Sequence, residues 1–279
     1  MRIDTHQHFW SYNPREYGWM VPGMEALRRD CLPADLAPLL EASHIDGTIA
    51  VQACPTLEES AWLLGLADQY PFILGVVGWV DLCSARADRE LEKFSCHPRF
   101  RGVRHLVQDE PDDQFLLRDD FRRGVGELQK YGLTYDLLLF PRHLPFAFDL
   151  AKRFREQPFV VDHLSKPLIK AHQLEPWASE IRRLAELPNV YCKVSGMVTE
   201  ADWHGWKPAD FTPYLDVVFE SFGTKRVMVG SDWPVCTLAA SYTRVMQLAA
   251  DYLRKLSKDE QAAVWSQNAM RFYGLPERG

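Results

Sequence analysis

The strongest constraint on the fold is an alternation of short β-rich runs with helical stretches along the whole chain. The runs predicted as strands are residues 2–9, 47–53, 72–80, 100–107, 133–140, 159–163, 190–195 and 226–231. Strands that alternate with helices require right-handed crossovers and therefore a parallel sheet. Eight such units favour a closed (β/α)8 TIM barrel over a doubly wound sheet. No G-x-G-x-x-G follows the first run, which removes the usual reason to choose a dinucleotide-binding sheet.

Two helix starts carry a capping-box pattern, in which the first and fourth residues satisfy each other's backbone donors. These pairs are Thr56 with Glu59 and Ser257 with Glu260. The second pair follows the last predicted strand and so predicts an extra C-terminal helix. Because no linker, repeat or charge block interrupts the chain, we expect residues 1–279 to form one domain.

Charge and composition exclude several classes of partner. The net charge is −6 and no Lys/Arg run is present, so we expect neither nucleic acid nor an anionic membrane as a partner. The longest apolar stretch, residues 72–80, is too short to span a membrane, and the polar start does not resemble a signal peptide. Six scattered cysteines without a C-x-x-C pair indicate reduced thiols in the cytoplasm. The oligomeric state is left open.

Two histidines, His6 and His8, lie one residue apart in the first predicted strand. Residues i and i+2 of a strand point to the same face, so both imidazoles share one side of the sheet. If that face is the barrel interior, the pair requires a metal, a carboxylate or a substrate beside it. An H-x-H pair also occurs by chance, so it needs support from elsewhere in the chain.

His163 and Asp232 provide that support, because each ends an apolar run. Polar residues at the carboxyl ends of barrel strands are typical of catalytic sites. His163 has an alternative role in capping the sheet edge. Asp232 has an alternative role as an N-cap of the next helix, a position that Pro234 also fits. In a barrel, however, strands one, six and eight would bring His6, His8, His163 and Asp232 to one mouth.

The fourth predicted strand contains Arg104 and His105, of which alternation turns one inward and the other outward. We expect Arg104 to face inward as a clamp for an anion or a hydroxyl group. Tyr135, Asp136 and Lys193 are weaker candidates on strands five and seven. A carbamylated Lys193 bridging two metals is disfavoured, because no second ligand set is evident.

The loop at residues 10–32 is unusually aromatic, with Tyr12, Tyr17 and Trp19. It is a candidate lid over the barrel mouth, with packing on the barrel rim as an equal alternative. No G-x-S-x-G motif and no activated cysteine is evident, so attack by an activated water is the simplest mechanism.

Four motifs together resemble the amidohydrolase superfamily. They are HQHFW at 6–10, DHLSKP at 162–167, KVSG at 193–196 and GSDWP at 230–234. The closest resemblance is to its branch of sugar-acid and pyrone-dicarboxylate lactonases, which includes L-fuconolactonase and L-rhamnonolactonase. The resemblance implies a (β/α)8 barrel that hydrolyses a lactone ring, such as L-fucono- or L-rhamnonolactone.

The resemblance also implies roles for individual residues. His6, His8, His163 and Asp232 match the metal-binding and catalytic positions of the family. The fifth-strand histidine that completes the metal site in the wider superfamily is missing here. Since some lactonases of this branch work without a metal, one Zn²⁺ ion and no required metal remain alternatives.

The expected mechanism makes Asp232 the general base that takes a proton from water. His6, His8 and His163 would polarise the lactone carbonyl, directly or through one Zn²⁺. The residues expected to hold the polyhydroxylated ring are Arg104, Lys166, Trp10, Trp79 and Trp233.

Two other functions remain open at this level. Metal-dependent decarboxylases of aromatic or muconate-like acids share the barrel and the H-x-H motif, as do other amidohydrolases. A non-catalytic barrel that binds a sugar acid is the third alternative. The sequence also does not choose among sugar lactones, which differ in hydroxyl stereochemistry and ring size.

Overall fold

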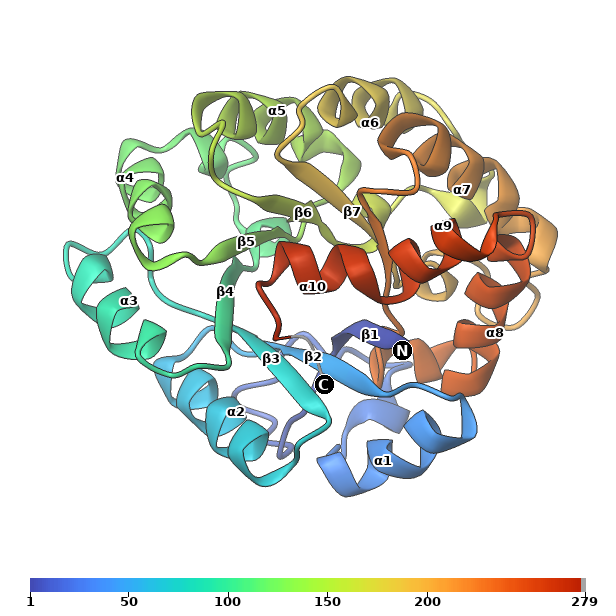
Figure 1. Cartoon of the computed structure of the whole chain (residues 1–279), viewed down its shortest axis with the longest axis horizontal. Helices are drawn as coiled ribbons and strands as arrows, with labels where there is room; N and C mark the ends of the chain where they lie inside the picture. The colour runs from blue at the N-terminus through green and yellow to red at the C-terminus, as the bar shows by residue number, and fades with distance from the viewer. Residues whose placement is uncertain (277–279) are drawn as a thin grey trace.

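Eight parallel strands follow one another in chain order around a barrel in the computed structural model, which describes residues 1–276 (Figure 1). The strands are β1 (Ile3–Gln7), β2 (Gly47–Val51), β3 (Ile73–Gly78), β4 (Phe100–His105), β5 (Thr134–Leu137), β6 (Phe159–Val161), β7 (Val190–Val194) and β8 (Val227–Val229). Each lies inside one of the eight predicted runs. The predicted (β/α)8 barrel is therefore confirmed. Each predicted run, however, extends beyond the carboxyl end of the strand that it contains.

Each strand is followed by a helix, and these eight helices surround the barrel (Figure 1). They are α1 (Pro33–Ala42), α2 (Leu57–Gln69), α3 (Ala87–Ser95), α4 (Asp119–Leu128), α5 (Leu144–Arg153), α6 (Trp177–Ala185), α7 (Pro208–Phe222) and α8 (Tyr242–Leu253). The predicted C-terminal helix is present as α9 (Lys258–Ala262), a π-helical turn at Ala263–Gln267, and α10 (Asn268–Phe272).

Only one of the two predicted capping boxes forms completely. Ser257 caps α9 and Glu260 bonds back to the backbone N–H of Ser257. At α2, the Thr56 hydroxyl accepts the N–H of Glu59, but the Glu59 carboxylate turns away from Thr56. The predicted box at α2 was wrong in this half, because the carboxylate accepts two backbone N–H groups of the loop before α2 instead.

The C-terminal segment covers one end of the barrel, and α10 lies across that opening in Figure 1. Phe272 and Tyr273 pack with Ile3 and Met228 in a cluster inside the barrel floor. Ile3 begins β1, so this floor lies at the amino ends of the strands. The opposite end, formed by the carboxyl ends of the strands, is left for the loops that carry the site.

The barrel closes between β1 and the residues that follow β8. Asp232 N–H donates to the His6 carbonyl at 2.8 Å, and His8 N–H donates to the Trp233 carbonyl at 2.7 Å. The buried Asp4 carboxylate accepts the N–H of Ser231 at 2.8 Å and its hydroxyl at 2.6 Å. Burial raises the pKa of Asp4 to about 6 despite these donors. We call this contact between β1 and residues 230–233 the closing seam.

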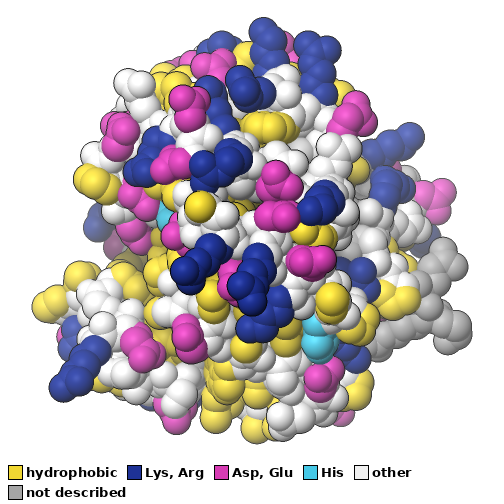
Figure 2. Space-filling view, turned by 90° about the vertical axis from the view of Figure 1, so that its left-hand side faces the viewer, with side chains coloured by type: hydrophobic (Ala, Val, Ile, Leu, Met, Phe, Trp, Pro, Cys, Tyr) yellow, Lys and Arg dark blue, Asp and Glu magenta, His cyan; other side chains and the backbone are white. Residues whose placement is uncertain are grey.

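The exterior carries mixed charges. On the face shown in Figure 2, basic and acidic side chains are interspersed rather than gathered by sign. Among residues 1–276, no helix is both long and apolar enough to cross a membrane. All six cysteines fall within this range and none is in a disulfide.

Candidate active site

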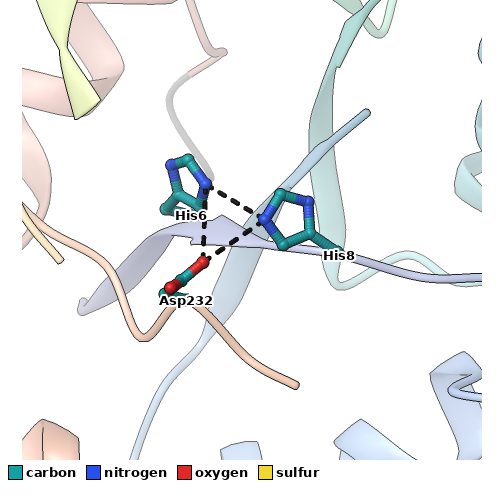
Figure 3. A group of neighbouring side chains, drawn as sticks. All are labelled: His6, His8 and Asp232. Atoms are coloured by element: carbon teal, nitrogen blue, oxygen red, sulfur yellow. Dashed lines mark hydrogen bonds and ion pairs between the residues drawn. The ribbon is translucent and has the colours of Figure 1, made fainter. Parts of the chain in front are cut away.

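The structure brings His6, His8, His163 and Asp232 together at the carboxyl end of the barrel (Figure 3 draws three of them). The Nε2 atoms of His6 and His8 are 3.2 Å apart. Asp232 Oδ1 lies 3.3 Å from Nε2 of His8, 3.7 Å from Nε2 of His163 and 3.9 Å from Nε2 of His6. Each of the four side chains is at least nine-tenths buried.

Left-handed backbone turns aim two of these side chains into the site. β6 ends at Val161, and residues 163–166 all have φ between 50° and 60°. Asp232 also has a φ of 60°. Such conformations are unfavourable for residues with a Cβ and cluster at functional sites. His163, expected as the last residue of a strand, thus lies in a tight turn just beyond it.

Gly196 makes room for the His163 ring. A Cβ at this position would lie 2.4 Å from Nδ1 of His163, and Gly196 itself has a φ of 60°. The neighbouring Ser195 hydroxyl lies 2.9 Å from the same Nδ1 atom. The KVSG motif therefore supplies both the space and the hydrogen bond that fix the orientation of His163.

The hydrogen bonds of His8 define which of its nitrogens faces the centre of the site. Nδ1 of His8 lies 2.8 Å from the Val51 carbonyl, which can only accept, so Nδ1 carries the proton. In the neutral ring, Nε2 then presents a lone pair toward Asp232 Oδ1 at 3.3 Å. Two acceptors at this distance need a shared proton or a cation between them.

The donor set fits a zinc ion. His6, His8 and Asp232 form one group of ligand atoms that lie within 4.8 Å of one another, and His6, Asp162 and His163 form another. Imidazole nitrogens with a carboxylate oxygen are the ligands of catalytic zinc, which leave one position for water. Nδ1 of His6 lies 3.2 Å from Asp162 Oδ1, the carboxylate–histidine arrangement that orients metal ligands.

The protonation states of these side chains also favour a zinc site. Burial lowers the pKa of both His6 and His163 well below the usual range, so both rings are neutral at pH 7. Burial alone would raise the pKa of Asp232, but His163 and His8 beside it hold that pKa below its ordinary value. The site therefore combines neutral imidazoles with an ionised carboxylate, as both metal binding and base catalysis require.

A buried charge network lies beneath the histidines. Asp162 pairs with Arg104 Nη1 at 3.1 Å and with Lys193 Nζ at 3.0 Å. Lys193 also contacts Asp136, which accepts the Tyr273 hydroxyl at 3.0 Å. Lys193 is thus paired with two carboxylates. Asp162, in contrast, is a site residue that was not predicted from the sequence. An acid directly before His163, at the end of a buried run, was the available signal.

Arg104 faces inward and His105 outward, as alternation predicted. His105 stacks on Phe115 outside the barrel with a centroid distance of 4.7 Å. The Arg104 guanidinium bonds to Gln52 and Asp162 and lies 3.2 Å from His6 Nε2. Most of its N–H groups are therefore engaged within the protein, although its side chain reaches the cavity.

A cavity of about 280 Å³ opens over the site. His8, His163, Asp232, Arg104 and Lys166 line it, together with residues of the loops after β1, β4, β7 and β8. This volume is close to the lower end for small-ligand pockets, roughly 300 Å³.

The three tryptophans expected to hold substrate do not line this cavity. Trp10 is fully buried, and its indole N–H donates to the Arg29 carbonyl at 2.8 Å, where it holds the loop after β1. Trp233 is buried in the closing seam, and the Trp79 indole bonds to His105. The tryptophans that do line the cavity are Trp19 and Trp203. Side-chain direction in these loops depends on the chain path, which periodicity does not define.

The loop at residues 10–32 packs on the barrel rim, as one of the two alternatives predicted, and it also borders the cavity. Trp19 and Met24 line the cavity, whereas Tyr17 and Met20 are buried against the barrel rim. The Tyr17 hydroxyl reaches Glu59 at 3.4 Å. The loop is therefore a packed wall of the cavity.

Glu59 ties this wall to the loop after β2. Its carboxylate accepts the N–H groups of Ala53 at 2.9 Å and Cys54 at 2.8 Å, and burial raises its pKa to about 7. Because the folded state holds this proton more tightly than the unfolded state, its contribution to stability is complete below about pH 4.5 and is lost as pH rises through 7. Glu59→Gln cannot bind this proton, so its free energy of unfolding should fall by up to about 3 kcal/mol less than that of the wild type as pH rises.

Urea unfolding at pH 5 and pH 8 measures the effect. The wild type should lose more free energy of unfolding between these pH values than Glu59→Gln does. Glu58→Gln, an exposed carboxylate on the same turn, is the matched control and should follow the wild type. Equal pH dependence in all three proteins would contradict the assignment.

A (β/α)8 barrel that gathers three histidines and an aspartate at its carboxyl end has the architecture of a hydrolase that activates water. The chain belongs to the amidohydrolase family, whose model, described as amidohydrolase, matches residues 3–275. It is 42% identical to an L-fucono-1,5-lactonase from Burkholderia multivorans, over 99% of this chain and 97% of the relative. It is also 37% identical to an L-fucono-1,5-lactonase from Burkholderia ambifaria, over 98% of this chain and 96% of that relative.

The solved structures agree with this family assignment. A crystal structure of an amidohydrolase from Burkholderia multivorans with bound zinc superimposes with a TM-score of 0.95. The two sequences are 42% identical, and the match covers 99% of this chain and 100% of the other. The match therefore includes the loops as well as the barrel strands and helices.

Proposed function

We propose that this protein hydrolyses the lactone ring of a sugar-derived lactone, with L-fucono-1,5-lactone as the first candidate substrate. The observation that carries the proposal is the ionised Asp232, buried beside three histidines in a cavity of small-ligand size. The similarity to two L-fucono-1,5-lactonases over nearly the whole chain supports the choice of substrate.

In the proposed mechanism, Asp232 removes a proton from water as the water oxygen attacks the lactone carbonyl carbon. The negative charge that develops on the carbonyl oxygen is stabilised at the histidine cluster. The bond between the carbonyl carbon and the ring oxygen then breaks, and Asp232 returns its proton to that oxygen. The product is a hydroxy acid, and Asp232 is again ionised.

We propose that His6, His8 and Asp232, with His163 beside them, hold one zinc ion. When bound, the metal would lower the pKa of water and polarise the lactone carbonyl. The bound zinc in the related crystal structure supports this proposal. β5 has no histidine, and its buried acid, Asp136, is engaged by Lys193 and Tyr273. The ligands of the ion would therefore come from β1 and the residues that follow it, and from the residues just after β6 and β8.

A pH-indicator assay with a panel of aldonolactones tests the activity and the metal together. We expect acid release from L-fucono-1,5-lactone, close to one zinc per chain, and loss of turnover on chelation that zinc restores. Turnover that survives complete metal removal would overturn the zinc role but not the lactonase. Release of CO₂ from an aromatic acid would instead identify a decarboxylase, and binding without turnover a sugar-acid-binding barrel.

We also propose a cytoplasmic location, supported by the six unpaired cysteines. No bridge constrains the barrel, so a reducing compartment leaves its stability unchanged. Fractionation of cells that express the chain without a tag measures this directly.

A further inference from the structure

Glu200 is a cavity residue that the proposed mechanism leaves without a role. It ends a 3-10 turn at Val198–Glu200 in the loop after β7, and it lines the cavity together with Asp232 and Lys166. Within residues 1–276, its carboxylate forms no hydrogen bond and no ion pair. Its side chain therefore faces the cavity with its acceptor capacity unused.

The surroundings of the Glu200 carboxylate raise its pKa on balance. Burial raises the pKa of Glu200, Lys166 lowers it, and Asp232 raises it again. The fully buried Asp4 carboxylate, by contrast, has several donors at the closing seam. Glu200 is only half-buried, so its unpaired carboxylate stays open to the cavity, where a bound ligand can donate hydrogen bonds to it.

Two further polar groups around the cavity are also unused. The buried Gln108 Oε1 atom has no hydrogen-bond partner in the described chain. The Lys166 ammonium group lies over the Phe140 ring at 5.4 Å and makes no ion pair there. The hydroxyl of Thr199, by contrast, donates to the Gly196 carbonyl at 2.8 Å.

These unused groups come from neighbouring parts of the barrel mouth. Gln108, Lys166 and Glu200 follow β4, β6 and β7, whereas the loops after β8 and β1 add Leu238 and Trp19. Because the strands lie in chain order around the barrel, the loops after them do too. The arc after β4, β6 and β7 therefore carries these unused polar groups beside apolar Leu106 and Trp203. Apart from His8 and Asp232, the arc across the closing seam offers apolar surface.

The geometry points to Glu200 as the residue that binds the ring hydroxyl groups of the substrate and so selects hydroxylated lactones. A carboxylate has four lone pairs and can accept hydrogen bonds from two neighbouring hydroxyls at once. The inference rests on the proposed lactonase function and deepens it.

The test compares two 1,5-lactones that share a ring and differ in hydroxyl groups, L-fucono-1,5-lactone and unsubstituted δ-valerolactone. Loss of a hydrogen bond to a charged group should reduce kcat/KM of Glu200→Ala for L-fucono-1,5-lactone about 10- to 100-fold, mainly through KM. The loss for δ-valerolactone should be at least about tenfold smaller. Glu200→Gln keeps one acceptor oxygen and should lie between the wild type and Glu200→Ala.

Glu186→Ala, an exposed carboxylate at the end of α6, is the matched control for the loss of a negative charge. Equal losses of kcat on both lactones would overturn the inference and identify Glu200 as a proton donor. No loss on either lactone in Glu200→Ala or Glu200→Gln would also overturn it. A wild type that hydrolyses only L-fucono-1,5-lactone supports hydroxyl recognition, and the KM order of the variants then decides the role of Glu200. A wild type that hydrolyses neither lactone contradicts the proposed function instead.

Discussion

Replacing Asp232 with asparagine is expected to reduce kcat about 10³-fold, within the range that removal of a general base produces. The amide would keep the size of the side chain and an oxygen that faces the histidines, but it cannot accept the proton of water. Asp232 is well placed for this transfer because its pKa lies below its ordinary value in spite of its burial, so the carboxylate is ionised at pH 7. Turnover of L-fucono-1,5-lactone at saturating substrate measures the effect.

Two measurements separate loss of the base from loss of the site. Thermal unfolding of the variant should stay close to that of the wild type, and turnover should be compared in excess zinc, because Asp232 is also a proposed zinc ligand. Asp88→Asn makes the same carboxylate-to-amide change on α3, where the carboxylate pairs with Lys130, and should retain full activity. Near-normal turnover by Asp232→Asn would disprove the general-base assignment.

Replacing Gly196 with alanine is expected to reduce kcat/KM about 100-fold, although Gly196 carries no reactive group. The added Cβ would lie 2.4 Å from Nδ1 of His163, so the imidazole has to move. A displacement of about 1 Å at a catalytic group is enough for a loss of this size. The left-handed φ also makes alanine about 1–2 kcal/mol less stable than glycine here.

Gly132→Ala isolates the backbone effect from the displacement of the ring. Gly132 has a φ of 64°, close to that of Gly196, but a Cβ there meets no atom within 4 Å. Both variants should therefore lose stability, and only Gly196→Ala should lose activity. Equal kcat/KM values in the two variants would show that Gly196 does not position His163.

The fold was predictable because each strand is a local feature of the sequence. The apolar runs and the polar residues at their ends needed no knowledge of distant contacts. His6, His8, His163 and Asp232 could be chosen in this way, since a barrel brings the carboxyl ends of all its strands together. The same rule applied to Asp162 would have added it to the site.

The loop residues could not be predicted, because their directions depend on the tertiary path. Trp10 and Trp19 lie in the same loop, yet one is a buried anchor and the other lines the cavity. Glu200 likewise follows β7 by several residues, beyond any strand period. Glu59 illustrates the limit of local rules. Its carboxylate does not complete the predicted capping box, because it accepts the backbone N–H groups of Ala53 and Cys54 instead.

The closing seam has a consequence for how the chain acquires its activity. His6 and His8 belong to the first strand and Asp232 follows the last, so the site unites the most distant parts of the barrel sequence. A partly folded chain can form its helices and inner strand pairs and still keep these residues far apart. Contacts of such long sequence separation form late and slowly. Recovered turnover would therefore report completed folding, whereas recovered helical signal alone would not.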